Sequence, residues 1–239
     1  MEQHRTILVA DVEKYSRRNG DDQAKLQSAL VESLDQGAEA AKLATFEWDR
    51  QKQGDGQFVV LPARTDPMTV LGPFVTALSK SLLVRQTATF RIRVRLSIHE
   101  GPIRLDGVNG FPGDHAVEPA RLVGAQPLRR ALAARPEACL GVIISERFFK
   151  DYVGQRPGGP PRDQFRRVDL VEKDKPYVAY IHLPGHNVHA LDLSPTSPAA
   201  PTSPDRSDGD RDGPVYYVSG AGSNVATYGA QTNHQNFGR

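Results

Sequence analysis

The sequence predicts an α+β fold, in which a sheet rich in antiparallel strand pairs carries helices on one of its faces. The first observation is that short strand-like runs come in pairs joined by turns, which favours hairpins over parallel crossovers. The second is that longer stretches with apolar residues at helical spacing separate these pairs. A chain dominated by hairpins with helices between them argues against a doubly wound parallel sheet.

The chain begins with a strand and a helix. Thr6–Val12 (TILVADV) is a short run rich in β-branched residues and predicts a buried strand that ends at Asp11. Asp21 or Asp22 can then cap a helix that runs to about Leu43. The apolar positions of this helix keep a spacing that places them on one face: Leu26, Leu30, Leu34, Ala38 and Ala41.

A hairpin is predicted over Phe46–Leu61 (FEWDRQKQGDGQFVVL), turning at Gly54-Asp55-Gly56. Asp-Gly between two strand-like runs is a strong hairpin signal, and glycine allows a positive φ in the turn. Asn would serve equally well at the tip. Asp55 is therefore either an ordinary turn residue or a carboxylate presented to a metal ion.

The middle of the chain adds a helix and the clearest strand. Asp66-Pro67 predicts a capped helix start, although Pro73 inside the pattern would delay the regular helix. Phe90–His99 alternates apolar and polar residues, which predicts a strand with a core face and a polar face. Gly101-Pro102 should end this strand, and Ile103–Leu105 should form a short partner strand after the break. Three arginines on the polar face are either solvated or line a dimer groove that holds a triphosphate: Arg91, Arg93 and Arg95.

The remaining elements close the domain. A helix is expected over Ala116–Ala134, bent near Pro119 or interrupted near Pro127. Four shorter elements follow it, namely a buried strand, a short helix and two closing strands: Leu140–Ser145, Glu146–Val153, Phe165–Leu170 and Tyr177–His182.

Composition narrows the function classes. The 239 residues carry a formal net charge of +2 with scattered Lys and Arg, which gives no argument for a nucleic-acid partner. The single cysteine, Cys139, excludes an internal disulfide and a cysteine zinc site. We see no signal peptide and no apolar span of about 18 residues, so we expect a cytoplasmic protein without a membrane partner.

The chain divides into three regions of different composition. Residues 1–185 form the predicted domain, and residues 186–214 form a flexible linker rich in Pro, Ser and Asp. Residues 215–239 are low in charge and rich in Tyr, Gly, Asn and Gln, and such segments can stack as steric zippers. This tail resembles the short amyloid motifs of bacterial defence and cell-death signalling, which pair with an effector protein. The alternative is a disordered polar terminus.

Two carboxylates and an arginine stand out as candidates for chemistry. If the first strand neighbours the hairpin, Asp11 and Asp55 meet at one end of the sheet, where they can hold Mg²⁺ or Mn²⁺. Otherwise Asp11 is a turn or capping residue. In Gly110–Leu122 (GFPGDHAVEPARL), a glycine-rich loop leads into a helix that carries Arg121. Its guanidinium could face phosphate oxygens, and the alternative is a solvated helix arginine.

In this order and spacing, four stretches resemble the catalytic domain of class III nucleotide cyclases, the adenylate/guanylate cyclase family. ILVADVEKYS resembles the family's first metal-binding strand, and QKQGD resembles its KxxGD hairpin. IRVRLSIHEGPIRLDG resembles the next strand with its HxG turn. GFPGDHAVEPARL resembles the segment that supplies a base contact and the transition-state arginine. The resemblance covers about residues 5 to 183.

The resemblance implies a ferredoxin-like α+β domain that works as a homodimer with active sites shared between subunits. Asp11, Val12 and Asp55 would bind two Mg²⁺ or Mn²⁺ ions. Arg121, supplied by the other subunit, would stabilise the transition state. The nucleotide-binding positions would be Gln51, Lys52, Gly54 and Asp114. The implied reaction converts a nucleoside triphosphate to a 3′,5′-cyclic nucleotide and pyrophosphate.

The sequence departs from the family pattern where the base is read. Gln51 stands at the position of the family's lysine, and Lys52 is one residue off, which turns its side chain to the other face of a strand. Val117 replaces the family's asparagine four residues before the arginine, and Pro119 follows. Two functions are compatible with this pattern. One is a cyclase of altered base preference, and the other is a catalytically inactive cyclase-homology sensor or adaptor that signals through assembly of its tail.

Overall fold

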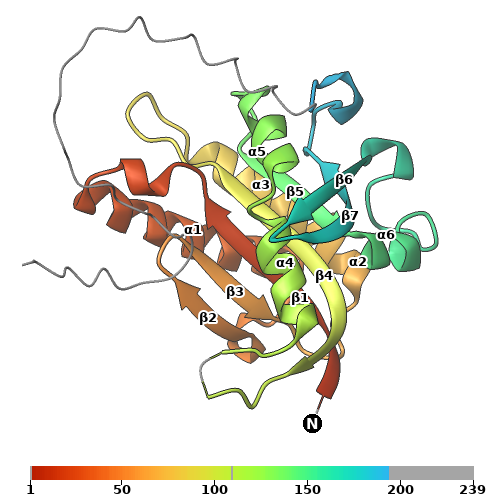
Figure 1. Ribbon diagram of the computed structural model, residues 1–239. Helices are drawn as coiled ribbons and strands as arrows, with labels where there is room; N and C mark the ends of the chain where they lie inside the picture. The colour runs from red at the N-terminus through yellow and green to blue at the C-terminus, as the bar shows by residue number, and fades with distance from the viewer. Residues whose placement is uncertain (1, 109, 194–239) are drawn as a thin grey trace, which may run out of the picture. The chain divides into compact units, whose positions relative to one another are not determined.

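The computed structural model describes residues 2–108 and 110–193. These residues form one seven-stranded sheet with the order β2-β3-β1-β4-β5-β7-β6 (Figure 1). The β4–β5 pair is parallel, and the other neighbouring strands of this sheet are antiparallel. The strands are β1 (Glu2–Val12), β2 (Asp49–Gln53), β3 (Gly56–Val60), β4 (Val94–Arg104), β5 (Leu140–Ser145), β6 (Arg166–Glu172) and β7 (Lys175–His182). The predicted α+β class with a sheet rich in antiparallel pairs is confirmed.

Helices cover both faces of this sheet, whereas the sequence predicted them on one face. The helices are α1 (Gly20–Ala40), α2 (Pro67–Thr69), α3 (Val75–Val84), α4 (Asp114–Leu122), α5 (Gln126–Ala133) and α6 (Glu146–Tyr152). On one face, Leu8 and Ala10 of β1 belong to the same buried cluster as residues of α1 and α3. On the other face, Ile7 and Val9 are buried with Ala116 of α4. Successive side chains of a strand point to opposite faces, so the continuous apolar run Ile7–Ala10 of β1 requires a helical layer on each face.

Strand β4 differs most from its predicted form. It runs without interruption through Gly101-Pro102, where the sequence predicted a break. Gly101 and Pro102 remain in the strand because they pair with Arg5 and His4 of β1. Glycine is needed at 101 because His115 of α4 packs there: an added Cβ would lie 2.2 Å from the imidazole. The face predicted to be polar and solvated is also buried, since Arg95, Ser97 and His99 are 6%, 0% and 1% exposed. Helix α4 lies over this face, as Figure 1 shows.

The helix boundaries follow local capping chemistry. Helix α1 is capped by Asn19, whose Oδ1 accepts the backbone N–H of Asp22 at 2.9 Å, so neither Asp21 nor Asp22 is the cap. Asp66 caps α2 as predicted. The helical stretch begins there and passes Pro73 through a π-helical turn over Val70–Phe74. The helix predicted over Ala116–Ala134 is interrupted at residues 123–125, so its break lies near Pro127.

One helical stretch, Pro67–Val84, is long and apolar enough by length and composition to cross a membrane, contrary to the sequence expectation. Within the domain it is a core element, because Leu71, Leu78 and Leu82 are fully buried. The core continues past the predicted boundary at residue 185, since Val188 and Leu191 are also buried. The predicted tail and most of the predicted linker lie outside the described residues.

Candidate active site

The predicted carboxylates line one cavity of about 410 Å³ at the carboxyl end of β1. Strand register explains this arrangement. Asp11 lies opposite Gly56 of β3, and the backbone N–H of Val12 donates to the carbonyl of Asp55 at 3.0 Å. The cavity is completed by the loop after β1 and by two arginines: Glu13, Lys14, Tyr15, Ser16, Arg17, Arg95 and Arg129.

Asp11 is the most perturbed acid of this cavity. Burial raises the pKa of its carboxyl, and the nearby charge of Asp55 raises it further, while the Arg95 guanidinium acts in the opposite direction. Its Oδ2 accepts a hydrogen bond from Arg95 Nη2 at 2.6 Å. Its Oδ1 is buried and has no hydrogen-bond partner among the described residues. A buried carboxylate oxygen without a partner is an acceptor prepared for a cation or a donor.

This donor set fits a divalent cation with hard-oxygen preference. Mg²⁺ is commonly held by one or two carboxylates, several waters and substrate phosphates, so Asp11 Oδ1 and Asp55 provide the protein's share. No group of three or more His, Cys, Asp or Glu side chains arranged for a metal occurs among residues 2–108 and 110–193. The remaining ligands would therefore come from water and from the substrate.

Of the two arginines of this cavity, the sequence raised Arg95 only as one of three strand arginines that could line a triphosphate groove, and it did not identify Arg129. Arg95 lies directly opposite Asp11 in the β1–β4 register, which only the strand pairing reveals. The other two arginines of this face have structural roles: Arg91 and Arg93 donate to the backbone carbonyls of Pro136 and Ala138 at 2.5 and 2.9 Å. Arg129 comes from α5, far away in sequence.

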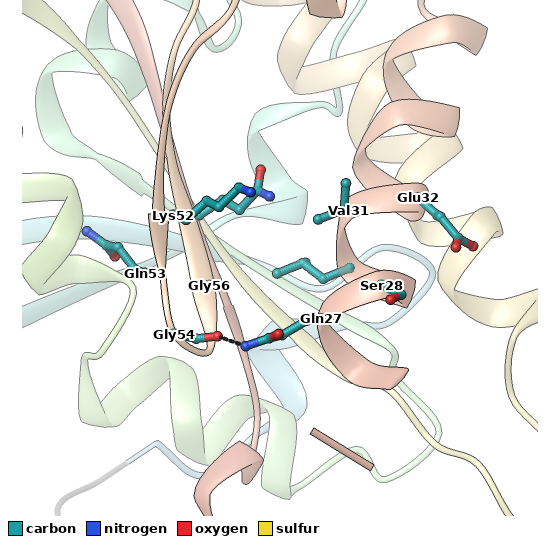
Figure 2. Close-up of a pocket in the computed structure, with 10 residues that line it drawn as sticks. Gln27, Ser28, Val31, Glu32, Lys52, Gln53, Gly54 and Gly56 are labelled. Atoms are coloured by element: carbon teal, nitrogen blue, oxygen red, sulfur yellow. Dashed lines mark hydrogen bonds between the residues drawn. The ribbon is translucent and has the colours of Figure 1, made fainter. Parts of the chain in front are cut away.

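The predicted nucleotide-binding residues do not converge. Gln51 contacts Gly110 on the face covered by α4: a Cβ added to that glycine would lie 2.6 Å from Gln51 Oε1. Lys52 lies on the other face, where it extends from β2 toward α1 (Figure 2). Lys52 and Gly54 line a second cavity there, between α1 and the hairpin, and the Gly54 carbonyl accepts a hydrogen bond from Gln27 Nε2 at 2.6 Å.

Arg121 and Asp114 of α4 lie outside the cavity of their own chain. Arg121 Nη1 donates to the Tyr177 hydroxyl at 2.7 Å. Asp114 begins the helix, has a side chain 85% exposed, and pairs with Lys175 at 3.5 Å. A single copy of the chain therefore does not bring these two residues to the carboxylates.

Comparison with solved structures identifies the fold. The guanylyl cyclase Cya2 matches with a TM-score of 0.53 and 14% identity over 81% of this chain and 98% of that chain. An adenylate/guanylate cyclase/hydrolase from Silicibacter pomeroyi gives 0.54 and 20% over 77% of this chain and 98% of that chain. The guanylate cyclase domain of RhGC from Catenaria anguillulae, solved with GTP, gives 0.51 and 16% over 76% and 97%.

No protein-family model matches the sequence, and no curated protein matches it. The structural matches cover nearly the whole length of the solved cyclase domains, and at identities of 20% or less they concern the fold. The described part of this chain has the fold of the class III adenylate/guanylate cyclase catalytic domain.

Proposed function

We propose that the chain is a nucleotide cyclase-like signalling protein that converts a nucleoside triphosphate to a 3′,5′-cyclic nucleotide and pyrophosphate. The observation that carries this proposal is the composition of one cavity. Asp11 and Asp55 provide oxygens for cations, and Arg95 and Arg129 provide positive charge for phosphates. The solved guanylate cyclase domain with bound GTP has the same fold and supports the proposal.

Each side chain has a proposed role. Asp11 and Asp55 hold two divalent ions, whose chemistry is to neutralise phosphate charge and favour the deprotonated 3′-hydroxyl. The guanidinium groups of Arg95 and Arg129 bind and orient the triphosphate. A bond forms between the 3′-oxygen and the α-phosphorus, the α–β bridging bond breaks, and the hydroxyl proton is lost to solvent. Positioning supplies most of the acceleration.

The active assembly in this proposal is a homodimer. Arg121 does not line the cavity of its own chain, so it serves the cavity of the second copy and stabilises the charge that develops on the phosphate. Gln51 and Asp114 contact the base. Gln51 can both donate and accept hydrogen bonds, so its side chain is compatible with a purine or a pyrimidine.

The test is a product assay on the full chain with each of the four ribonucleoside triphosphates and Mn²⁺. We expect one of them to give a cyclic product, and Asp55→Ala to abolish it. Asp49→Ala is the matched control, because Asp49 is an exposed acid of the same hairpin that does not line the cavity. If no triphosphate gives a product while sedimentation shows a dimer, the enzymatic proposal is rejected.

A second candidate is an inactive cyclase-homology sensor or adaptor in a bacterial defence or cell-death pathway. The hydrogen bond from Arg95 to Asp11 favours it, because this arginine already neutralises one predicted metal ligand. In that case a triphosphate binds without being converted, and the output is assembly of residues 215–239 with an effector protein. Binding of a triphosphate measured by calorimetry, together with the absence of product, separates this candidate from the cyclase.

A further inference from the structure

A second cavity, of about 500 Å³, lies between α1 and the β2–β3 hairpin. It is on the opposite face of the sheet from Asp11. Lys52 pairs with Gln57, and Gln57 pairs with Ala10, whose side chain points toward α1. No residue that lines this groove also lines the Asp11 cavity. The lining residues of the hairpin–α1 groove are Gln27, Ser28, Leu30, Val31, Glu32, Lys52, Gln53, Gly54, Gly56 and Gln57.

The groove carries one uncompensated positive charge. Within residues 2–108 and 110–193, Lys52 has no carboxylate partner. Glu32, the acid of the lining, is already bonded to Arg85 at 2.9 Å. Figure 2 shows Lys52 extending from β2 toward α1, where Val31 faces it, while Glu32 points away. Lys52 is exposed, so its ammonium group is accessible to an anionic ligand that enters the groove.

The rest of the lining offers hydrogen bonds and apolar contact. Gln57 is only 5% exposed, and its buried Oε1 has no hydrogen-bond partner among the described residues. Such a group is costly unless a ligand or water satisfies it. Leu30 and Val31 line the groove with apolar atoms, whereas the Gln53 side chain points away from α1 (Figure 2). Amide side chains recognise the edges of nucleobases well, and an apolar wall can cover the face of the ring.

We propose that the hairpin–α1 groove binds a nucleoside monophosphate, with the phosphate on Lys52 and the base beside the Gln57 amide. Each ligand part has a matching protein group: the anion matches the unpaired ammonium, the base edge matches the Gln57 amide, and the ring matches Leu30 and Val31. The site is separate from the Asp11 cavity, so it does not depend on the reaction proposed there.

The test uses the full chain, titrated with AMP and with UMP and followed by amide NMR and calorimetry. We expect shifts in residues 27–32 and 52–57, and binding at least about tenfold tighter than for adenosine, uridine or inorganic phosphate, since hydrogen bonds to charged groups are strong. Lys52→Ala should weaken binding by about the same factor, and Lys52→Arg should restore most of it. Lys25→Ala is the control, because Lys25 is an exposed lysine of α1 outside the groove.

Asp55→Asn distinguishes binding in the groove from binding in the Asp11 cavity, since Asp55 lines only the latter. We expect this substitution to leave AMP binding in the groove intact. Three results would overturn the proposal. The first is that neither monophosphate shifts the amide signals of the groove residues. The second is that the shifts occur around Asp11 and are lost in Asp55→Asn. The third is that inorganic phosphate alone binds as tightly as the nucleotide. The native fold of Lys52→Ala is checked by its unfolding midpoint, and Lys52→Arg provides the comparison if the alanine variant is unstable.

Discussion

At the scale of single residues, the pair formed by Asp11 and Arg95 sets the charge balance of the candidate active site. Both side chains are largely buried, 19% and 8% exposed, and their hydrogen bond is 2.6 Å long. Removing one partner of a buried pair leaves the other charge without compensation. The same arginine lies beside the phosphate-binding space proposed above, so it combines a structural contribution with a proposed binding role.

Arg95→Met should therefore cost about 3 kcal/mol of unfolding free energy, measured by urea denaturation at pH 7. Arg167→Met is the control, because Arg167 forms an exposed pair with Asp169 at 2.7 Å. That change should leave the unfolding free energy close to that of the parent chain, because exposed ion pairs contribute little to stability. Equal losses in the two variants would show that Asp11 and Arg95 are hydrated in solution.

The buried imidazole of His99 links stability to pH. Its Nδ1 is 2.8 Å from Ser145 Oγ, and its Nε2 is 2.8 Å from His115 Nδ1. Burial, together with the positive charges of neighbouring groups, lowers the pKa of His99 to about 3. The charged and titratable groups around it come from α4, α6 and β1: His115, Glu118, Arg147 and His4.

The unfolded chain binds a proton at this histidine below its ordinary pKa of 6.5, and the folded chain does not. The contribution of His99 to the free energy of unfolding is therefore fully present above pH 6.5. It declines as the pH falls toward 3, by up to about 1.4 kcal/mol per pH unit. His99→Gln should flatten this slope by about that amount. Urea unfolding at pH 6.5, 5.5 and 4.5 measures it, and parallel curves for the two proteins would contradict the prediction.

At the scale of elements, the β2–β3 hairpin depends on one close backbone approach. A Cβ on Gly56 would lie 2.1 Å from the carbonyl oxygen of Ala10 in β1, whereas a Cβ on Gly54 meets nothing within 4 Å. Neither glycine adopts a positive φ. The reason for glycine in this turn is therefore contact with β1 at Gly56, and not the left-handed backbone that the sequence suggested.

Gly56→Ala should destabilise the domain by about 2–3 kcal/mol, because the added methyl group forces β3 away from β1. Gly54→Ala is the matched control in the same turn and should stay within about 1 kcal/mol of the parent chain. Urea denaturation measures both changes. A tolerated Gly56→Ala would mean that the β1–β3 register differs from the one described.

Local sequence signals predicted the helices and strands more reliably than they predicted the contacts between distant elements. The hairpin, β5 and the Asp66 cap follow from turn and capping chemistry within a few residues, and all three are confirmed. The meeting of Asp11 and Asp55 was predicted on the condition that the first strand neighbours the hairpin, and the β1–β3 pairing meets that condition. The interruption predicted for β4 was wrong, because Gly101 pairs with β1. Arg95 was predicted only as a strand arginine that is either solvated or lines a triphosphate groove, because its place opposite Asp11 depends on strand register, which is a tertiary property.

At the scale of the whole molecule, the separation of Arg121 from the carboxylates predicts complementation between two inactive variants. Asp55→Ala and Arg121→Ala should each abolish product formation. An equal mixture should recover about a quarter of the parent activity, since half of the dimers are mixed and each of these has one intact site. Cyclic product is measured after mixing and re-equilibration. No recovery, with subunit exchange confirmed by sedimentation, would exclude a shared site.

The segment 215–239 carries a second prediction at this scale. Its charge is confined to Arg239, and its Tyr, Val, Asn and Gln content favours stacked strands. A peptide of these residues should form thioflavin-positive cross-β fibres. A scrambled peptide of identical composition is the control, and it should assemble more slowly. A 215–239 peptide that remains monomeric at high concentration would remove tail assembly as an output.

Because β2 is pleated, its successive residues serve the two opposite faces of the sheet, so one mutation in β2 can affect both cavities. Gln51 and Lys52 are adjacent in the chain but serve opposite sides of the sheet. Deletion of Gln53, between Lys52 and the turn, would move Gln51 and Lys52 each to the opposite face of the sheet. Every residue of a strand changes face when its register slips by one. A lysine would then face the side of the sheet that carries Gln51, directly before the turn, and the groove would lose its cation. One in-frame codon deletion would thus alter the chemistry of both cavities in a single mutational event.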